Sequence, residues 1–396
     1  MLTSVPTTQD AISGPQLRLW QKLIRMDWFL FFLLVALVCV SVIIIYSAHY
    51  ASDSPTFQKT YINQMVWGVI GFGVYFVMAF TDYRLWLRYA YWGFVFMVVL
   101  LVAVLLIGKA EYGAKSWIRF GPIGFQPSEL CKLAFILFLA RLFIESEDRG
   151  LKLFLSVTFF VIIPSVLIFK QPALGSAAVF LPTAYSMMFV AGVRQRYLLT
   201  PVILAIALVC YISWCLFPPP DSTRLPHVPF LKPYMENRIR TFVDPNLDPK
   251  GAGWTINQSL NAIGSGGFNG KGYLQGSVVL LGFLPGTIAH NDFIFPVLCE
   301  QFGFVGGGTL IVLLGVLLLM IIRIAFATTD PVGTYIASGI AGMLFTHIFV
   351  NIGMTIKVVP ITGIPLPFVS YGGTFLVVCL ASIGLVQSIW IHRKNE

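Results

Sequence analysis

Stretches of about 20 mostly apolar residues recur along nearly the whole chain, and short polar segments separate them. A helix needs an apolar stretch of about that length to cross the hydrocarbon core of a bilayer. Windows of this size predict about ten transmembrane helices, at residues 28–46, 63–80, 87–107, 128–144, 153–169, 174–192, 197–217, 302–324, 334–352 and 371–391. The expected fold class is therefore an all-α integral membrane protein, a single polytopic domain over residues 1–396.

The basic residues predict the orientation of this domain. Lys and Arg gather in alternate connections between the predicted spans, and such connections face the cytoplasm by the positive-inside rule. Both termini are then cytoplasmic, as residues 1–27 and 392–396. The longest polar segment, 218–295, becomes a large extracytoplasmic loop between the seventh and eighth spans.

Composition agrees with this interpretation and excludes some functions. The 396 residues are 57% hydrophobic and only 11% charged, whereas soluble domains are about 25% charged. The net charge of +9 is scattered, and no basic run resembles a nucleic-acid patch, so membrane lipids are expected partners and nucleic acid is not. The six cysteines contain no CxxC pair, which favours buried apolar roles over disulfides or metal ligands.

The polar residues on the predicted outer face begin with the loop 108–132, which contains Lys115 and Trp117. Glu129 and Lys132 are three residues apart, a spacing that puts two side chains on one helix face. Two interpretations stay open for this pair: an ion pair inside an outward-facing cavity, or a structural pair that neutralises itself between helices.

Within the long outer loop, "GWTINQSLNAIG" predicts a short amphipathic helix that the following glycines end. Arg238 and Lys271 are cations of this loop, and Lys271 lies in the stretch "GSGGFNGKG". That stretch is not a phosphate-binding P-loop, because no Ser or Thr follows the lysine and no strand precedes it. A flexible turn near anionic lipid headgroups is the expected role.

A second irregular stretch, "NIGMTIKVVPITGIPLPFVSYGG" at 351–373, holds three prolines and four glycines between two spans. Non-helical backbone survives at membrane depth only where it lines a cavity or is buried in protein. The stretch predicts a re-entrant segment, with a kinked connector as the alternative.

Asp292 lies where the long loop meets the eighth span. Glu300 follows eight residues later, a little over two helical turns, so both carboxylates could face one cavity at different depths. The alternative is that Asn291 or Asp292 caps the helix. The local residues favour neither.

Four blocks, "GAKSWIRFGPIGFQPSELCK", "GWTINQSLNAIGSGGFNGKG", "HNDFIFPVLCEQFGFVGG" and "NIGMTIKVVPITGIPLPFVSYGG", resemble the SEDS family, which includes RodA, FtsW and SpoVE. The resemblance runs from about Trp28 to the end, and "TGIPLPFVSYGG" with Thr362 is closer to the RodA type. The chain departs from the family pattern at Gly286 and Ala173, where acids are usual, and at Lys357.

This resemblance implies a peptidoglycan glycosyltransferase of the bacterial cytoplasmic membrane. Such enzymes polymerise lipid II at the outer leaflet, for wall elongation and cell shape, alongside a class B penicillin-binding protein that cross-links the product. The resemblance implies that Asp292 is the essential aspartate. It also matches Glu129, Lys132 and Trp117 to family positions.

The implied reaction transfers a glycan from undecaprenyl pyrophosphate to the 4-hydroxyl of lipid II, with inversion. It needs a general base, for which Asp292 is the candidate, and positive charge near the departing pyrophosphate. The substrate-binding candidates are Trp117, Lys115, Glu129, Lys132, Arg238, Lys271, His290 and Glu300. A divalent cation, Mg²⁺ or Mn²⁺, is an option, and no other cofactor is implied.

Three other functions stay open: a lipid II flippase or transporter, a scaffold, and a division-type, FtsW-like member of the same family. A transporter should hold charges near the middle of the membrane. Here the charges collect on the outer face, which favours the enzyme.

Overall fold

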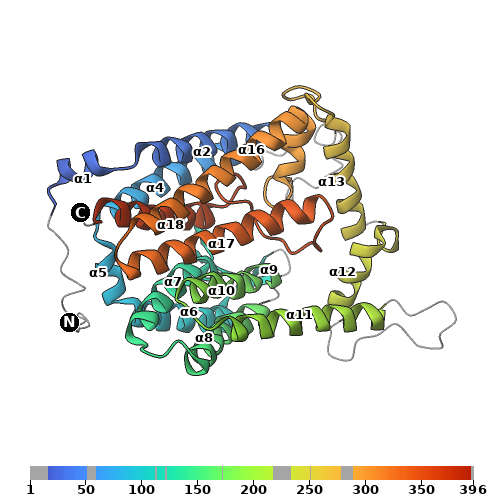
Figure 1. The fold of residues 1–396 in the computed structure, drawn as a ribbon. Helices are drawn as coiled ribbons and strands as arrows, with labels where there is room; N and C mark the ends of the chain where they lie inside the picture. The colour runs from blue at the N-terminus through green and yellow to red at the C-terminus, as the bar shows by residue number, and fades with distance from the viewer. Residues whose placement is uncertain are drawn as a thin grey trace, which may run out of the picture.

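Each of the ten predicted spans coincides with helical structure in the computed structural model (Figure 1). The structure describes residues 17–50, 59–111, 114–120, 123–171, 173–216, 233–249, 251–277 and 289–393. In chain order the helices are α1 (Leu19–Arg25), α2 (Trp28–His49), α4 (Thr60–Phe80), α5 (Tyr83–Arg88), α6 (Ala90–Ile107), α7 (Pro127–Glu145), α8 (Leu151–Lys170), α9 (Leu174–Ala178), α10 (Phe180–Val190), α11 (Gln195–Leu216), α12 (Pro233–Val243), η1 (Pro245–Leu247), α13 (Ala252–Gly266), α16 (Ile294–Ala327), α17 (Pro331–Thr355) and α18 (Gly373–Ile391).

The fold is an all-α membrane bundle, as the hydrophobic pattern predicts. Within the described residues, seven helices are long and apolar enough to cross a membrane. The predicted span 174–192 is divided into α9 and α10, and α6 is a shorter apolar helix. The charges of Glu129, Lys132 and Arg141 lower the apolar character of α7, although its length of 19 residues suits a span.

The core of the bundle forms around α18, which runs between α4 and α17 (Figure 1). Nearly all side chains of α18 are buried, which agrees with a helix that is hydrophobic on every side. Gly384 faces the backbone of Tyr75 in α4, where a Cβ would come within 2.6 Å of the Tyr75 carbonyl oxygen. A small residue at this crossing therefore lets the two helices approach closely.

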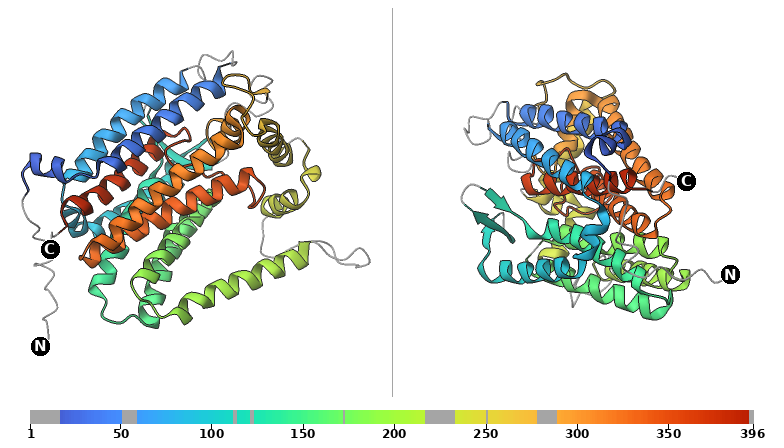
Figure 2. Two further views of the ribbon diagram at one scale, coloured as in Figure 1. Left: turned by 45° about the horizontal axis from the view of Figure 1, so that its top comes forward. Right: turned by 90° about the vertical axis from the view of Figure 1, so that its left-hand side faces the viewer.

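A small antiparallel sheet follows α6 and was not predicted (Figure 2). Its strands, in the order β1-β2-β3, are β1 (Lys109–Glu111), β2 (Ala114–Phe120) and β3 (Ile123–Phe125). Ile118 pairs with Phe125, and Phe120 pairs with Ile123. The strands are short and rich in charged and small residues, so their hydrophobic alternation is too weak to distinguish them from a loop.

One end of the bundle carries α12, η1 and α13, at the right of Figure 1. The predicted short helix in "GWTINQSLNAIG" is confirmed as part of α13. It ends at Gly267, whose φ of 58° belongs to the left-handed region that glycine adopts readily. Residues 278–288, and with them Gly286, lie outside the described residues.

The long helix α16 is broken near its N-terminal end. It spans 34 residues, but Gly303 has a φ of 64°, which no helical residue adopts. The glycine-rich stretch after α13 packs on this break: Lys271 N donates to Glu300 O, and Phe304 N donates to Gly267 O. A Cβ at Gly270 would lie 2.1 Å from the Gln301 carbonyl oxygen. The glycines therefore permit contact between two backbones. The stretch is thus fixed by packing on α16 and is not the flexible turn that the sequence predicted.

Candidate active site

The residues between α17 and α18, 356–372, form a non-helical segment that we call the re-entrant segment. Side chains of the neighbouring helices bind its backbone. Asn351 Nδ2 donates to Ile364 O at 2.7 Å, Ser41 Oγ donates to Val369 O at 2.7 Å, and Gln64 Nε2 donates to Ser370 O at 3.3 Å. These bonds replace the helical ones, as buried irregular backbone requires. This supports a segment buried in protein over the alternative of a simple kinked connector.

The turn that carries Asp292 is attached to the re-entrant segment and α17 through its main chain. Tyr371 N donates to His290 O at 2.9 Å, and Ser370 Oγ donates to Asn291 O. Asn351 Nδ2 donates to Asp292 O at 3.0 Å. Three consecutive carbonyl groups are thus bound, so the position of the turn does not depend on the aspartate side chain.

Asp292 is not a helix cap. The capping residue of α16 is Phe293, and no side chain caps the helix there. The Asp292 carboxylate also makes no hydrogen bond or ion pair within the described part of the chain. The Asp292 carboxylate therefore has no structural role among the described residues.

The Asp292 side chain lies beside Gly363 of the re-entrant segment. Gly363 is exposed and has a φ of 71°, and a Cβ built on it would be 3.4 Å from Asp292 Oδ2. Asp292 itself is half-buried, and burial among protein atoms raises its pKa from the usual 3.8 to about 6. An accessible, unpaired carboxylate with a raised pKa suits a general base that works near neutral pH.

His290 is buried between two rings rather than open to a ligand. Its Nδ1 lies 2.8 Å from His49 Nε2, and its ring packs against Tyr371 with centroids 5.2 Å apart. His49 ends α2, far away in the sequence, so the sequence analysis missed it. No local pattern could have revealed this partner.

Glu129 and Lys132 form a buried ion pair at the start of α7. Lys132 Nζ lies 2.8 Å from both Glu129 oxygens and 3.0 Å from His347 Nε2 of α17. His347 Nδ1 in turn lies 3.4 Å from Pro365 O of the re-entrant segment. Ser176 Oγ donates to Glu129 at 3.4 Å. The pair is therefore linked to the re-entrant segment through a histidine that the sequence analysis did not identify.

Arg238 of α12 also reaches the re-entrant segment, because its Nη1 donates to Ile361 O at 3.3 Å. Trp117 of β2 covers Gly124, whose carbonyl oxygen accepts from Thr374 Oγ1 at the start of α18. Nothing is described of the Lys115 side chain. Asp292, Arg238 and the Glu129–Lys132 pair thus converge on the re-entrant segment.

Lys271 and Glu300 form a separate pair at the break of α16. Lys271 Nζ lies 2.6 Å from Glu300 Oε1, and Ser277 Oγ contacts both groups. Glu300 is fully buried. Asp292 precedes the first residue of α16, so helical spacing does not relate its side chain to that of Glu300.

Within the described residues, no group of three or more His, Cys, Asp or Glu side chains is placed to hold a metal ion.

Comparison with known proteins agrees with this arrangement. The model of the cell cycle protein family FtsW/RodA/SpoVE matches residues 27–395. This chain belongs to that family. It is 34% identical to the peptidoglycan glycosyltransferase MrdB of Escherichia coli strain K12 over 385 residues, which cover 95% of this chain and 96% of MrdB. It is also 34% identical to the peptidoglycan glycosyltransferase RodA of Treponema pallidum, over 92% of this chain and 97% of that protein.

Solved structures of this family share the fold. One comes from a study of how a peptidoglycan synthase complex coordinates polymerization and crosslinking; it has a TM-score of 0.77 and 30% identity, covering 94% of this chain and 99% of that one. The rod shape determining protein RodA of Thermus thermophilus has a TM-score of 0.66 and 28% identity, over 94% and 98% of the two chains.

Proposed function

We propose that this family member is a peptidoglycan glycosyltransferase that polymerises lipid II at the outer leaflet of the bacterial cytoplasmic membrane, in cell-wall elongation. Its relatives named peptidoglycan glycosyltransferases cover nearly the whole chain. The observation that carries the assignment of the site is the Asp292 carboxylate, which is accessible, unpaired within the described residues and of raised pKa.

In the proposed reaction, Asp292 accepts the proton of the 4-hydroxyl of an incoming lipid II. The hydroxyl oxygen attacks the anomeric carbon of the growing glycan, and the bond to undecaprenyl pyrophosphate breaks with its electron pair leaving on the pyrophosphate. Attack opposite the leaving group converts an α-linked donor into a β-linked product. General-base assistance of this kind contributes about 10²–10⁴ in rate.

The pyrophosphate needs positive charge, and Arg238 is the best-placed candidate among the described cations. It is half-buried and donates one hydrogen bond to Ile361 O, so the other N–H groups of its planar guanidinium can bind phosphate oxygens. Lys132 and Lys271 are each bound to a carboxylate, so they are positioned to support the site rather than to bind the leaving group.

We also propose a class B penicillin-binding protein as the partner that cross-links the product. The support is the similarity to a chain of a peptidoglycan synthase complex in which polymerization and crosslinking are coordinated.

The test is glycan-strand formation from purified lipid II, with the partner present. Asp292→Asn should lower the rate about 10²–10⁴-fold. Asp244→Asn is the matched control, because Asp244 is an exposed carboxylate of the same outer segment, and it should keep the native rate. Full activity of Asp292→Asn would refute the general base. Lipid II transport between leaflets without polymerisation by the native protein would instead support a flippase.

A further inference from the structure

Three arginines from distant parts of the chain meet at the opposite, cytoplasmic end of the bundle. Arg25 ends α1, Arg323 lies in the last turns of α16, and Arg393 follows α18; we call them the arginine cluster. Two of them lie over the ring of Trp390, with the Arg393 Cζ 3.2 Å and the Arg323 Cζ 4.9 Å from its centroid. The indole therefore fixes both guanidinium groups in one place through cation–π contacts.

The positive charge of the arginine cluster is not neutralised within the described residues. Among the described residues its one acidic neighbour is Asp27, whose Oδ1 accepts from Leu30 N and whose Oδ2 lies 3.4 Å from Arg323 Nη1. Arg25 and Arg393 form no ion pair in the described chain. Burial, and then the charges of Arg323 and Arg25, lower the pKa of Arg393. Three guanidinium groups thus share one carboxylate.

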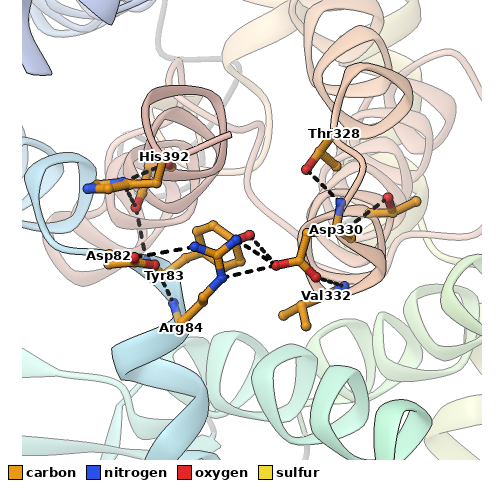
Figure 3. Close-up of polar contacts among 9 residues, drawn as sticks. Asp82, Tyr83, Arg84, Thr328, Asp330, Val332 and His392 are labelled. Atoms are coloured by element: carbon orange, nitrogen blue, oxygen red, sulfur yellow. Dashed lines mark hydrogen bonds and ion pairs between the residues drawn. The ribbon is translucent and has the colours of Figure 1, made fainter. Parts of the chain in front are cut away.

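Arg84, on the same face, shows what a neutralised arginine looks like in this protein (Figure 3). Its Nε and Nη2 donate to Asp330 Oδ2 at 3.1 and 2.9 Å, and its Nη1 lies 3.5 Å from Asp82. Two carboxylates serve one guanidinium there. The arginine cluster has three guanidinium groups for one carboxylate among the described residues and therefore has capacity for an external anion.

The surroundings of the arginine cluster identify the source of that anion. Ile24 and Trp20 of α1 and Trp28 at the start of α2 are 71%, 57% and 42% exposed. Tryptophan at such positions lies at the level of lipid headgroups. Arg323 is itself 55% exposed. A phosphate that belongs to a lipid would be held at this depth, with its acyl chains against the neighbouring apolar side chains.

We propose that the arginine cluster binds the headgroup phosphate of an anionic phospholipid of the inner leaflet, at the junction of α1, α16 and the end of α18. Guanidinium groups match phosphate oxygens through paired N–H donors. Basic pockets between membrane helices on the cytoplasmic side bind anionic headgroups in this way. The bound lipid bridges the first and last helical elements of the chain.

The test uses the full-length protein purified in detergent and native mass spectrometry with added phosphatidylglycerol, phosphatidylcholine or inorganic phosphate. The native protein should retain phosphatidylglycerol in preference to phosphatidylcholine, and phosphate should not displace it. The variant Arg25→Gln/Arg323→Gln/Arg393→Gln should bind phosphatidylglycerol more weakly, by about fivefold for each arginine removed. Arg393→Gln alone should weaken it about fivefold, which keeps the test valid if the triple variant does not fold.

The matched control is Arg88→Gln/Arg194→Gln/Arg196→Gln, which removes the same charge from exposed positions predicted to lie on the same side of the membrane and should retain the lipid. Unchanged lipid binding in the arginine-cluster variants overturns the proposal. Displacement of the lipid by inorganic phosphate at equal concentration also overturns it, because the site would then take a free anion.

Discussion

Asp292 combines a fixed backbone with a side chain that has no structural partner in the described chain. The carbonyl oxygens of His290, Asn291 and Asp292 each accept a hydrogen bond from the re-entrant segment or from α17. The carboxylate is therefore placed without being neutralised. Main-chain hydrogen bonds position Asp292, and its side chain stays available for chemistry at a crowded site.

The raised pKa of Asp292 predicts the pH dependence of polymerisation. Because the carboxylate is the proposed base, activity should be lost as pH falls through its pKa of about 6, rather than near the usual 3.8. Initial rates of glycan formation between about pH 4 and 8 should show a one-proton acid limb with that midpoint. A limb centred near pH 4 would contradict the burial effect.

The same shift predicts that Asp292 destabilises the folded protein. A carboxyl group whose pKa is higher in the folded than in the unfolded state weakens the fold once it ionises, so stability falls as pH rises from about 4 through 6. Asp292→Asn should therefore have a higher apparent melting temperature than the native protein at pH 7, and the difference should vanish below about pH 4. Equal melting temperatures at pH 7 would contradict this.

Gly363 predicts a second effect on the site. Ala at its φ of 71° is strained by about 1–2 kcal/mol, and its methyl group would lie 3.4 Å from Asp292 Oδ2. Gly363→Ala should lower the polymerisation rate more than it lowers the melting temperature. Gly308→Ala is the control, because a Cβ there meets nothing within 4 Å. Native activity of Gly363→Ala would show that this contact does not matter.

Among the elements, the re-entrant segment connects the parts of the site. Its Ile361, Gly363 and Pro365 contact Arg238, Asp292 and His347 respectively. Residues from α7, α12, α17 and the turn before α16 are therefore related through one short stretch of chain. A shift of this stretch would move several groups together.

The Glu129–Lys132 pair provides a test of that connection. Lys132→Met leaves a buried carboxylate without its partner, a change that typically costs about 3–5 kcal/mol. Glu129→Gln/Lys132→Met removes both charges and should regain much of the lost thermal stability. A double variant as unstable as the single one would contradict this. Polymerisation by the stable double variant then decides between the structural and the functional role.

The sequence predicted the helices well, because each membrane span carries its own apolar signal. It predicted the β1-β2-β3 sheet poorly, because three short strands without clear alternation of polar and apolar residues carry little signal. Asp292 was found through the family resemblance, since its local residues also fitted a helix cap. The pairs His49–His290 and Lys271–Glu300 could not be predicted, because 241 and 29 residues separate the partners.

For the whole molecule, the end of the bundle that carries α5 and the start of α17 joins segments that are far apart in the chain (Figure 3). Asp330 Oδ2 accepts hydrogen bonds from Tyr83 Oη at 2.6 Å and from Arg84 Nη2 at 2.9 Å. Its Oδ1 caps α17 by accepting from Val332 N at 3.0 Å. One carboxylate thus links the connection after α4 to the start of α17. It fixes the end of the bundle opposite the site.

Asp330→Ala should therefore lower the melting temperature, because it removes a cap worth about 1 kcal/mol and leaves the buried Arg84 with only the longer contact to Asp82. Asp148→Ala is the control: Asp148 is an exposed carboxylate that, among the described residues, accepts one hydrogen bond, from Gly150 N. Equal melting temperatures for the two variants would show that the link contributes little.

The break of α16 also indicates how far the bundle extends along the membrane normal. At about 1.5 Å per residue, Gly303 stands about 30 Å above Arg323, which equals the thickness of the hydrocarbon layer. A Cβ at Gly307 would lie 2.7 Å from Cys299 Sγ and 3.6 Å from the Phe295 ring. Residues 294–302 therefore fold back along the helix that follows Gly303 and place Asp292 on the same side of that break as Arg323. The proposed saccharide substrate would therefore reach the carboxylate below the level of Gly303, among protein side chains.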